Sequence, residues 1–68
     1  MFFNNPFLRI GNESSDMLID LRLPIAIEHK EDGNILTLHY HDGLRLSFEN
    51  VKPESYVNIT KRWKKVRR

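Results

Sequence analysis

The 68-residue chain has no cysteine and no long apolar run. Without cysteine there can be no disulfide, thiolate nucleophile or thiolate metal ligand. The longest apolar stretch falls well short of the ~18 residues that cross a membrane, and the apolar start is too short for a signal peptide. We therefore expect one small, soluble, cytoplasmic domain over residues 1–68, whose core buries only about 60% of the unfolded surface.

Patterns that carry catalysis are also missing. The chain has no Ser-x-x-Lys, no Gly-x-Ser-x-Gly and no glycine-rich phosphate loop, and its three glycines fall in predicted turns. Glu28 and Glu49 are expected on the outer face of a sheet. There they would form ion pairs with Lys30 and Arg45. Because so small a domain rarely encloses a deep pocket, we expect no enzyme and no cofactor.

Alternation of apolar and polar side chains predicts strands in the middle of the chain. Over residues 16–31 the apolar side chains share one parity, which indicates two strands or one strand kinked at Pro24, a residue without a ladder N–H. The set that shares this parity is Met17, Ile19, Leu21, Leu23, Ile25 and Ile27. A shorter strand is expected over residues 6–10.

Two Asp-Gly pairs predict hairpin turns of different length. A two-residue loop at Asp32-Gly33 places Ile27 opposite Leu38, so both stay on the apolar face. At residues 41–43 a two-residue loop would set apolar against polar side chains, whereas a three-residue loop with left-handed Gly43 keeps them matched. The longer loop predicts the pairs Tyr40–Leu44, Leu38–Leu46 and Leu36–Phe48.

The segment after residue 52 fits either a helix or a strand. Pro53 at the first position and Glu54 in the first turn favour a helix. Four apolar residues also recur on one helical stripe, namely Tyr56, Ile59, Trp63 and Val66. Residues 57–60 are poor helix formers, and Pro-Glu-Ser-Tyr-Val at 53–57 resembles the end of an SH3 domain over those five residues.

These observations predict a β-rich α+β fold. It would be an antiparallel meander of four or five strands, followed by a short basic helix packed through Tyr56, Ile59 and Trp63. The alternative is an all-β, small SH3-like barrel with a basic tail, in which residues 56–60 form the closing strand.

The predicted turn and strand register argue against a metal site at the histidines. His39 and His41 have the i, i+2 spacing of a chelating strand pair, with Asp42 beside them. The predicted turn removes His41 from the strand, and Arg45 opposite His39 would repel a cation. We therefore expect no metal. His29 is expected at the margin of the sheet.

Charge is distributed unevenly along the chain. Residues 1–60 hold five Lys or Arg and nine acids, a net charge of −4, whereas residues 61–68 form a basic C-terminal segment of +6. Lysine and arginine bind phosphates, and an aromatic ring among them can stack on an exposed base. The sequence thus predicts DNA or RNA binding, and the candidate residues are Lys61, Arg62, Trp63, Lys64, Lys65, Arg67 and Arg68.

Other partners fit the same composition. A protein-binding module or small inhibitor could dock on a larger complex by a sheet edge, with its basic end in an acidic groove. A second copy of the chain could pair along a strand edge, since one thin sheet needs its apolar face covered. Anionic membrane surfaces also attract basic segments, and a cationic run can be simply a solvated helix face.

Overall fold

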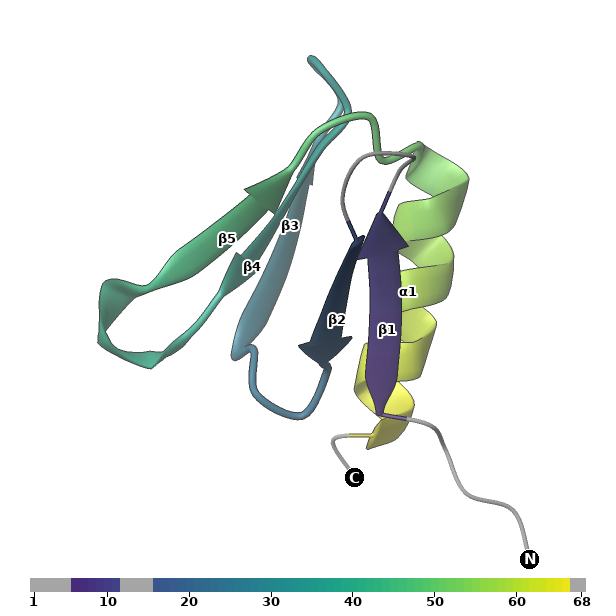
Figure 1. The fold of residues 1–68 in the computed structure, drawn as a ribbon. Coiled ribbons are helices and arrows are strands. Elements are labelled where there is room, and N and C mark those ends of the chain that lie inside the picture. Colours follow the sequence, from purple (N-terminus) through teal and green to yellow (C-terminus); the bar gives the residue numbers. More distant parts are fainter. Residues whose placement is uncertain (1–5, 12–15, 67–68) are drawn as a thin grey trace, which may run out of the picture.

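The computed structural model describes residues 6–11 and 16–66. Five antiparallel strands form two open sheets, and one helix follows them (Figure 1). The elements are β1 (Phe7–Gly11), β2 (Asp16–Asp20), β3 (Ala26–Lys30), β4 (Ile35–His39), the 3-10 turn η1 (His41–Gly43), β5 (Arg45–Phe48) and α1 (Pro53–Val66). The β-rich α+β prediction is confirmed. The SH3-like barrel is wrong, because residues 56–60 are helical.

The hairpin of β3 and β4 has the register of the two-residue loop. Ile27 lies opposite Leu38, as predicted. The Asn34 N–H donates to the Glu31 carbonyl at 3.2 Å, which closes the turn. Positive φ angles occur at Gly33 (80°) and at Asn34 (49°), two residue types that tolerate this conformation.

The hairpin of β4 and β5 confirms the three-residue loop. The predicted pairs Leu36–Phe48 and Leu38–Leu46 are both present, and the Tyr40 N–H donates across the turn to the Leu44 carbonyl at 2.7 Å. Gly43 takes the predicted left-handed conformation, with φ 76°. The alternation of side chains alone was sufficient to predict this loop, because only one loop length aligns the apolar residues of β4 and β5.

Between β2 and β3 the structure corrects the predicted single apolar face. Two strands are present, but the chain turns over residues 21–25, so β2 and β3 belong to different sheets. Leu21 is fully buried, whereas Leu23 and Ile25 are 59% and 42% exposed. The backbone N–H of Arg22 donates to the Asp20 carboxylate at 2.9 Å and fixes this turn. The alternation of apolar and polar residues in the sequence continues through the turn, although the strand ends there.

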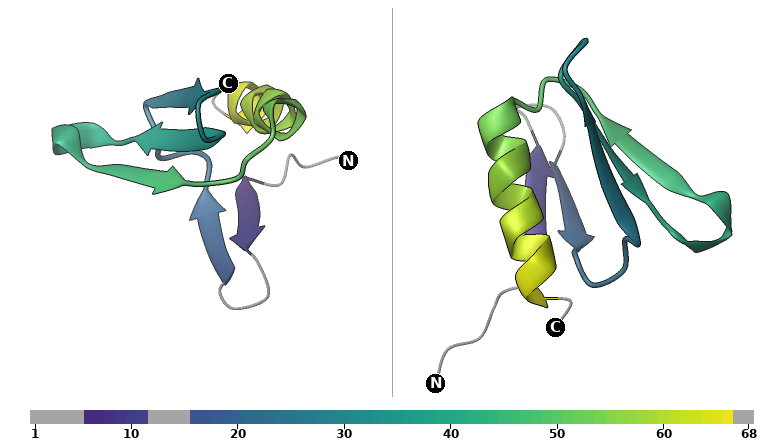
Figure 2. Two further views of the ribbon diagram at one scale, coloured as in Figure 1. Left: turned by 90° about the horizontal axis from the view of Figure 1, so that it is seen from above. Right: turned by 180° about the vertical axis from the view of Figure 1, so that it is seen from behind.

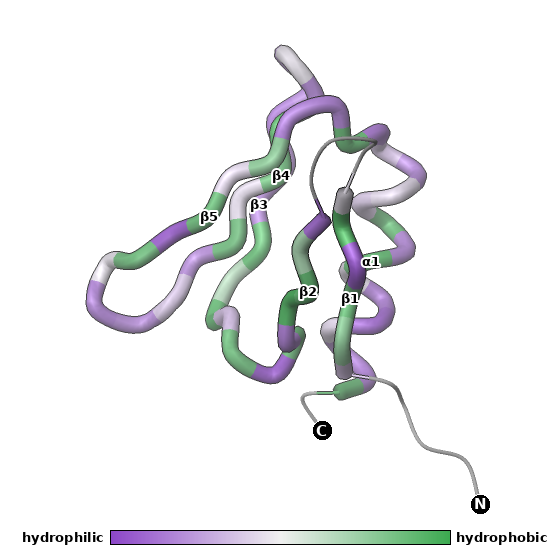
Figure 3. Tube along the Cα trace, viewed as in Figure 1, coloured by the Kyte–Doolittle hydropathy of each residue, from purple (hydrophilic) through white to green (hydrophobic). Residues whose placement is uncertain are grey.

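The β1–β2 hairpin and α1 enclose the core with the inner face of the three-stranded sheet (Figure 2). The buried residues of the core come from both sheets, the helix and two connecting segments: Ile19, Leu21, Leu36, Leu38, Val51 and Ile59. Apolar residues of the five strands and of α1 meet in this region (Figure 3). The predicted helical stripe is confirmed, since Tyr56, Trp63 and Val66 pack against the core beside Ile59.

His29 joins the sheet to the start of the helix. Its Nε2 donates to the Val51 carbonyl at 2.7 Å, and its ring stacks on Tyr56 with 5.0 Å between centroids. The Val51 N–H donates in turn to the Asn34 carbonyl at 2.8 Å. His29 therefore fixes how the chain leaves β5 and enters α1.

Helix packing can be tested with a buried and an exposed residue of α1. Ile59 is 8% exposed and Val57 is 47% exposed. We expect Ile59→Ala to lower the free energy of unfolding by about 2–4 kcal/mol, because it leaves a cavity between helix and sheet. Val57→Ala, the matched control, should change it by less than about 0.5 kcal/mol. Urea denaturation followed by circular dichroism measures both, and equal effects would contradict the packing of α1.

Acid should weaken the fold through two exposed carboxylates. Hydrogen bonds from Arg22 hold the pKa of Asp20 below its usual value, and Arg9 does the same for Asp16. A pKa lowered in the folded state gives stability that is present above the unfolded pKa and is lost as pH falls through the folded pKa. Urea midpoints should therefore fall from roughly pH 5 downward.

The contribution of Asp20 can be isolated by substitution. In Asp20→Asn the fall of the urea midpoint below roughly pH 5 should be shallower than in the parent protein. Glu31→Gln, in the exposed β3–β4 turn, is the control and should keep the parent slope. An Asp20→Asn profile parallel to the parent profile would show that the Arg22 contact adds no stability.

Candidate nucleic-acid interface

Three lysines of the basic segment lie on the solvent side of α1. Ile59 and Trp63 face the core, and Lys61, Lys64 and Lys65 are exposed. Residues three and four apart are neighbours on a helix surface, so Lys61 adjoins both of the others. We call Lys61, Lys64 and Lys65 the cationic face. Among the described residues, no ion pair is recorded at any of them.

Arg62 lies at the border of this face and contacts β1. Its Nη2 donates to the Phe7 carbonyl, and the side chain is only partly exposed. The contact joins residues 55 positions apart in the sequence. Arg62 therefore holds the end of α1 against the first strand, a role that the basic pattern did not indicate.

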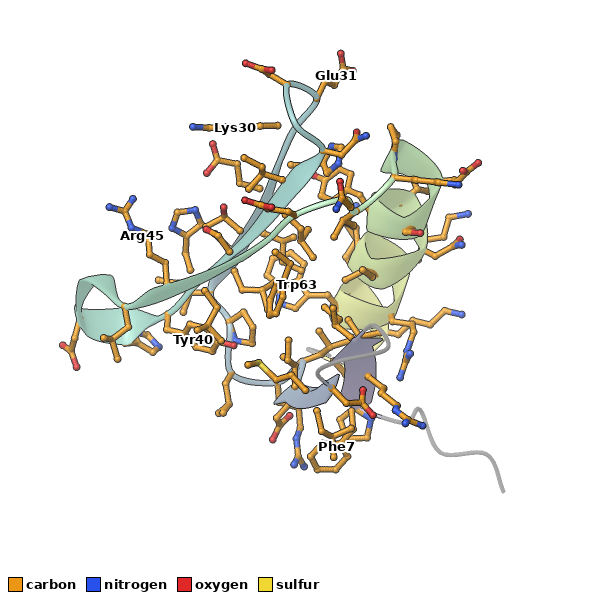
Figure 4. All side chains as sticks on the ribbon, turned by 45° about the horizontal axis from the view of Figure 1, so that its top comes forward. Phe7, Lys30, Glu31, Tyr40, Arg45 and Trp63 are labelled. Carbon is orange, nitrogen blue, oxygen red and sulfur yellow. The ribbon has the colours of Figure 1, made fainter. Side chains whose placement is uncertain are left out.

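Trp63 points from α1 toward the strands (Figure 4). Its Nε1 donates to the Pro24 carbonyl at 3.0 Å, and the indole is half-buried against the core. The position of Trp63 on the apolar stripe was the sequence signal for this packing. Stacking of Trp63 on a base stays a prediction, and such a base would reach only the part of the ring that remains exposed. Arg67 and Arg68 lie outside the described residues.

In the part of the chain that the structure describes, two arginines of the β1–β2 region are paired with acids, unlike the lysines of the cationic face. Arg9 forms an ion pair with Asp16 and Arg22 forms one with Asp20. Glu54 is the only acid in the sequence of α1, and it lies in the first turn. At the other end, Lys64 and Lys65 occupy the last turn, where the helix dipole favours positive charge. Within α1, the positive charge is therefore concentrated toward the C-terminal end.

The histidines do not form a metal centre in the described parts of the chain. His39 lies opposite Arg45, as predicted, and its Nε2 contacts Glu28 at 3.1 Å. His41 belongs to η1. No group of three His, Cys, Asp or Glu side chains able to hold a metal occurs over residues 6–11 and 16–66.

Neither ion pair predicted on the outer face of the sheet occurs among the residues that the structure describes. Glu28 contacts His39 instead of Lys30, because His39 lies on the neighbouring strand and faces the same side. An ion pair between Glu49 and Arg45 is likewise not found among the described side chains. Arg45 begins β5 and Glu49 follows its last residue, Phe48, so the two residues lie at opposite ends of the strand.

Comparison with known proteins finds no significant match among protein-family models, curated proteins or solved structures. Within the described residues, no helix has the length and apolar character needed to cross a bilayer.

The anchoring of the helix end can be tested at Trp63. Trp63→Phe keeps an aromatic ring in the core but removes the hydrogen bond from Nε1 to the Pro24 carbonyl. We expect it to lower the free energy of unfolding by about 1 kcal/mol, measured by urea denaturation with circular dichroism detection. Trp63→Ala should cost more, about 3 kcal/mol. Full stability in both variants would show that Trp63 does not anchor α1.

Proposed function

We propose that the chain is a small, non-enzymatic nucleic-acid-binding protein that contacts phosphates through its C-terminal helix. The observation that carries this proposal is the cationic face, three exposed lysines on one side of a helix whose opposite side is packed into the core. Residues 53–66 hold four cations and one acid, a net charge of +3. The helix therefore presents its positive charge from a fixed scaffold.

Phosphate binding by such a face is driven mainly by counterion release. Each lysine that neutralises a phosphate frees a condensed cation, so affinity depends steeply on salt and little on base sequence. The rest of the chain carries net negative charge, which would repel nucleic acid from the other surfaces and orient α1 toward it. A non-specific, phosphate-led contact is the mode of binding that these residues support.

Four further residues of the basic segment would contribute to different degrees. Arg67 and Arg68 follow α1 in the sequence and would extend the positive charge beyond it. Arg62 adds charge at the border of the cationic face while it contacts Phe7. Trp63, the predicted stacking residue, would add to single-strand affinity through its exposed part.

The alternative is a protein-binding module or small inhibitor that meets an acidic surface of a larger complex. The open edge of β5 favours it, because an exposed strand edge is a docking surface for other chains. The cationic face would then pair with carboxylates instead of phosphates. Nucleic-acid titration separates the two proposals directly.

The test is a salt titration of binding to short single-stranded and duplex DNA and RNA. We expect log Kobs to fall linearly with log salt. The charge-matched pair of variants is Lys61→Gln with Lys65→Gln, against Lys30→Gln with Lys52→Gln. The helix variant should bind more weakly and lose roughly 0.7–0.9 of slope per lysine removed. The control, of equal net charge, should keep nearly the parent affinity and slope.

Substitution is preferable to deleting the basic segment, because truncation after Thr60 would also remove Trp63 and Val66 from the core. Two results would contradict the proposal. One is an absence of binding at low salt. The other is an equal loss in both variants, which would show that net charge alone, and not the cationic face, determines the affinity.

A further inference from the structure

Within the described parts of the chain, β5 has a neighbouring strand on one side only and leaves its other backbone edge open. It is the last strand in the order β3-β4-β5. The Tyr40 N–H donates to the Leu44 carbonyl at 2.7 Å, so these backbone groups point toward each other, and every second pair along an antiparallel ladder repeats that orientation. The residues in between, Arg45 and Ser47, therefore direct their backbone N–H and C=O groups away from β4.

The inner face beside this edge is incompletely covered. Leu44 and Leu46 are 67% and 39% exposed, and Met17 on β2 is 44% exposed. A groove of about 580 Å³ separates the β1–β2 hairpin from the end of β5, and Met17 and Phe48 are among the residues that line it. The hairpin projects beyond the β5 side of the sheet (Figure 2, left). A strand added to β5 would thus have an apolar layer beneath it.

The outer face of the same segment carries one cation and one anion, placed symmetrically about Ser47. Arg45 and Glu49 are exposed, and with Ser47 they line one shallow surface on the outer side of the sheet. Arg45 points outward, away from the helix (Figure 4). The Ser47 side chain is small, and its hydroxyl is already bonded to Thr37 at 3.0 Å, so two Ser47 residues could approach without a steric conflict.

We propose that two copies of the chain form a homodimer by antiparallel pairing of their β5 strands about a twofold axis at Ser47. In this register Arg45 of each copy lies opposite Glu49 of the other, so one ion pair forms on each side of the axis. Leu46 lies opposite Phe48 of the second copy on the inner face. The outward backbone groups of Ser47 then form a hydrogen-bonded pair with their counterparts.

The charges of Arg45 and Glu49 favour this register over the other registers that the open edge of β5 allows. A twofold axis at Arg45 would set two guanidinium groups against each other, and an axis at Glu49 would do the same with two carboxylates. An axis at Leu46 would place Arg45 opposite Ser47 and leave both charges unmatched. The axis at Ser47 alone matches both charges and keeps apolar residues together. A surface that is complementary to itself in this way is what a twofold dimer requires.

The test is the molar mass across a dilution series, from sedimentation or from size exclusion with light scattering. The parent protein should pass from monomer to dimer as its concentration rises. Arg45→Glu and Glu49→Arg each place like charges opposite one another twice in a homodimer. Each should weaken dimerisation on the order of tenfold or more. The double variant should recover the parent behaviour, since it only exchanges the two charges.

An equimolar mixture of the two single variants tests the pairing of residues 45 and 49 most directly. In that heterodimer both positions again hold opposite charges, so the mixture should dimerise although neither variant does so alone. Circular dichroism and thermal unfolding first establish that each variant is folded. A parent protein that stays monomeric at every concentration, or single variants that dimerise like the parent, would overturn the proposal.

Ser47 gives an independent pair of variants should the charge variants not fold. Ser47→Pro removes the N–H that points to the open edge, and this position of an edge strand tolerates proline. Ser47→Ala loses the same hydroxyl bond to Thr37 but keeps the N–H. The alanine variant should dimerise and the proline variant should not, and equal dimerisation would overturn the proposal. These measurements need no nucleic acid, so they stand apart from the proposed function.

Discussion

Two side chains of β4, Leu36 and Leu38, have no solvent exposure at all, and the positions of the other layers follow from the need to cover them. A thin sheet of three strands cannot bury its inner face alone. The β1–β2 hairpin supplies Ile19 and α1 supplies Ile59, while the connecting segments supply Leu21 and Val51. In so short a chain this one contact region provides nearly all the burial that opposes chain entropy.

Polar contacts then fix how the covering elements sit. His29 links β3 to the approach to α1 through Val51, and Trp63 links the far end of the helix to Pro24. Both bonds satisfy carbonyl groups outside the strand ladders, which would otherwise lose their hydration on burial. Since the helix is held near both ends, its exposed lysines have a defined orientation relative to the sheet. The proposed phosphate contact depends on that orientation.

The local features were predictable, and the long-range ones were not. Both hairpin registers follow from alternation, because a shift by one residue would move Leu38 to the solvent side. The apolar stripe of α1 was visible for the same reason. Alternation over residues 16–31, in contrast, continued through a turn and hid the division into two sheets. Contacts such as Arg62 with Phe7 join residues 55 positions apart and leave no periodic signal in the sequence.

The phosphate contact proposed for the cationic face of α1 can be observed residue by residue. The most direct measurement is a nuclear magnetic resonance titration of the labelled protein with a short single-stranded oligonucleotide at low salt, read as amide shift changes residue by residue. We expect the largest changes to cluster at Lys61, Lys64 and Lys65 and to disappear when salt is added. Changes centred on the outer face of the three-stranded sheet, or no changes at all, would contradict it.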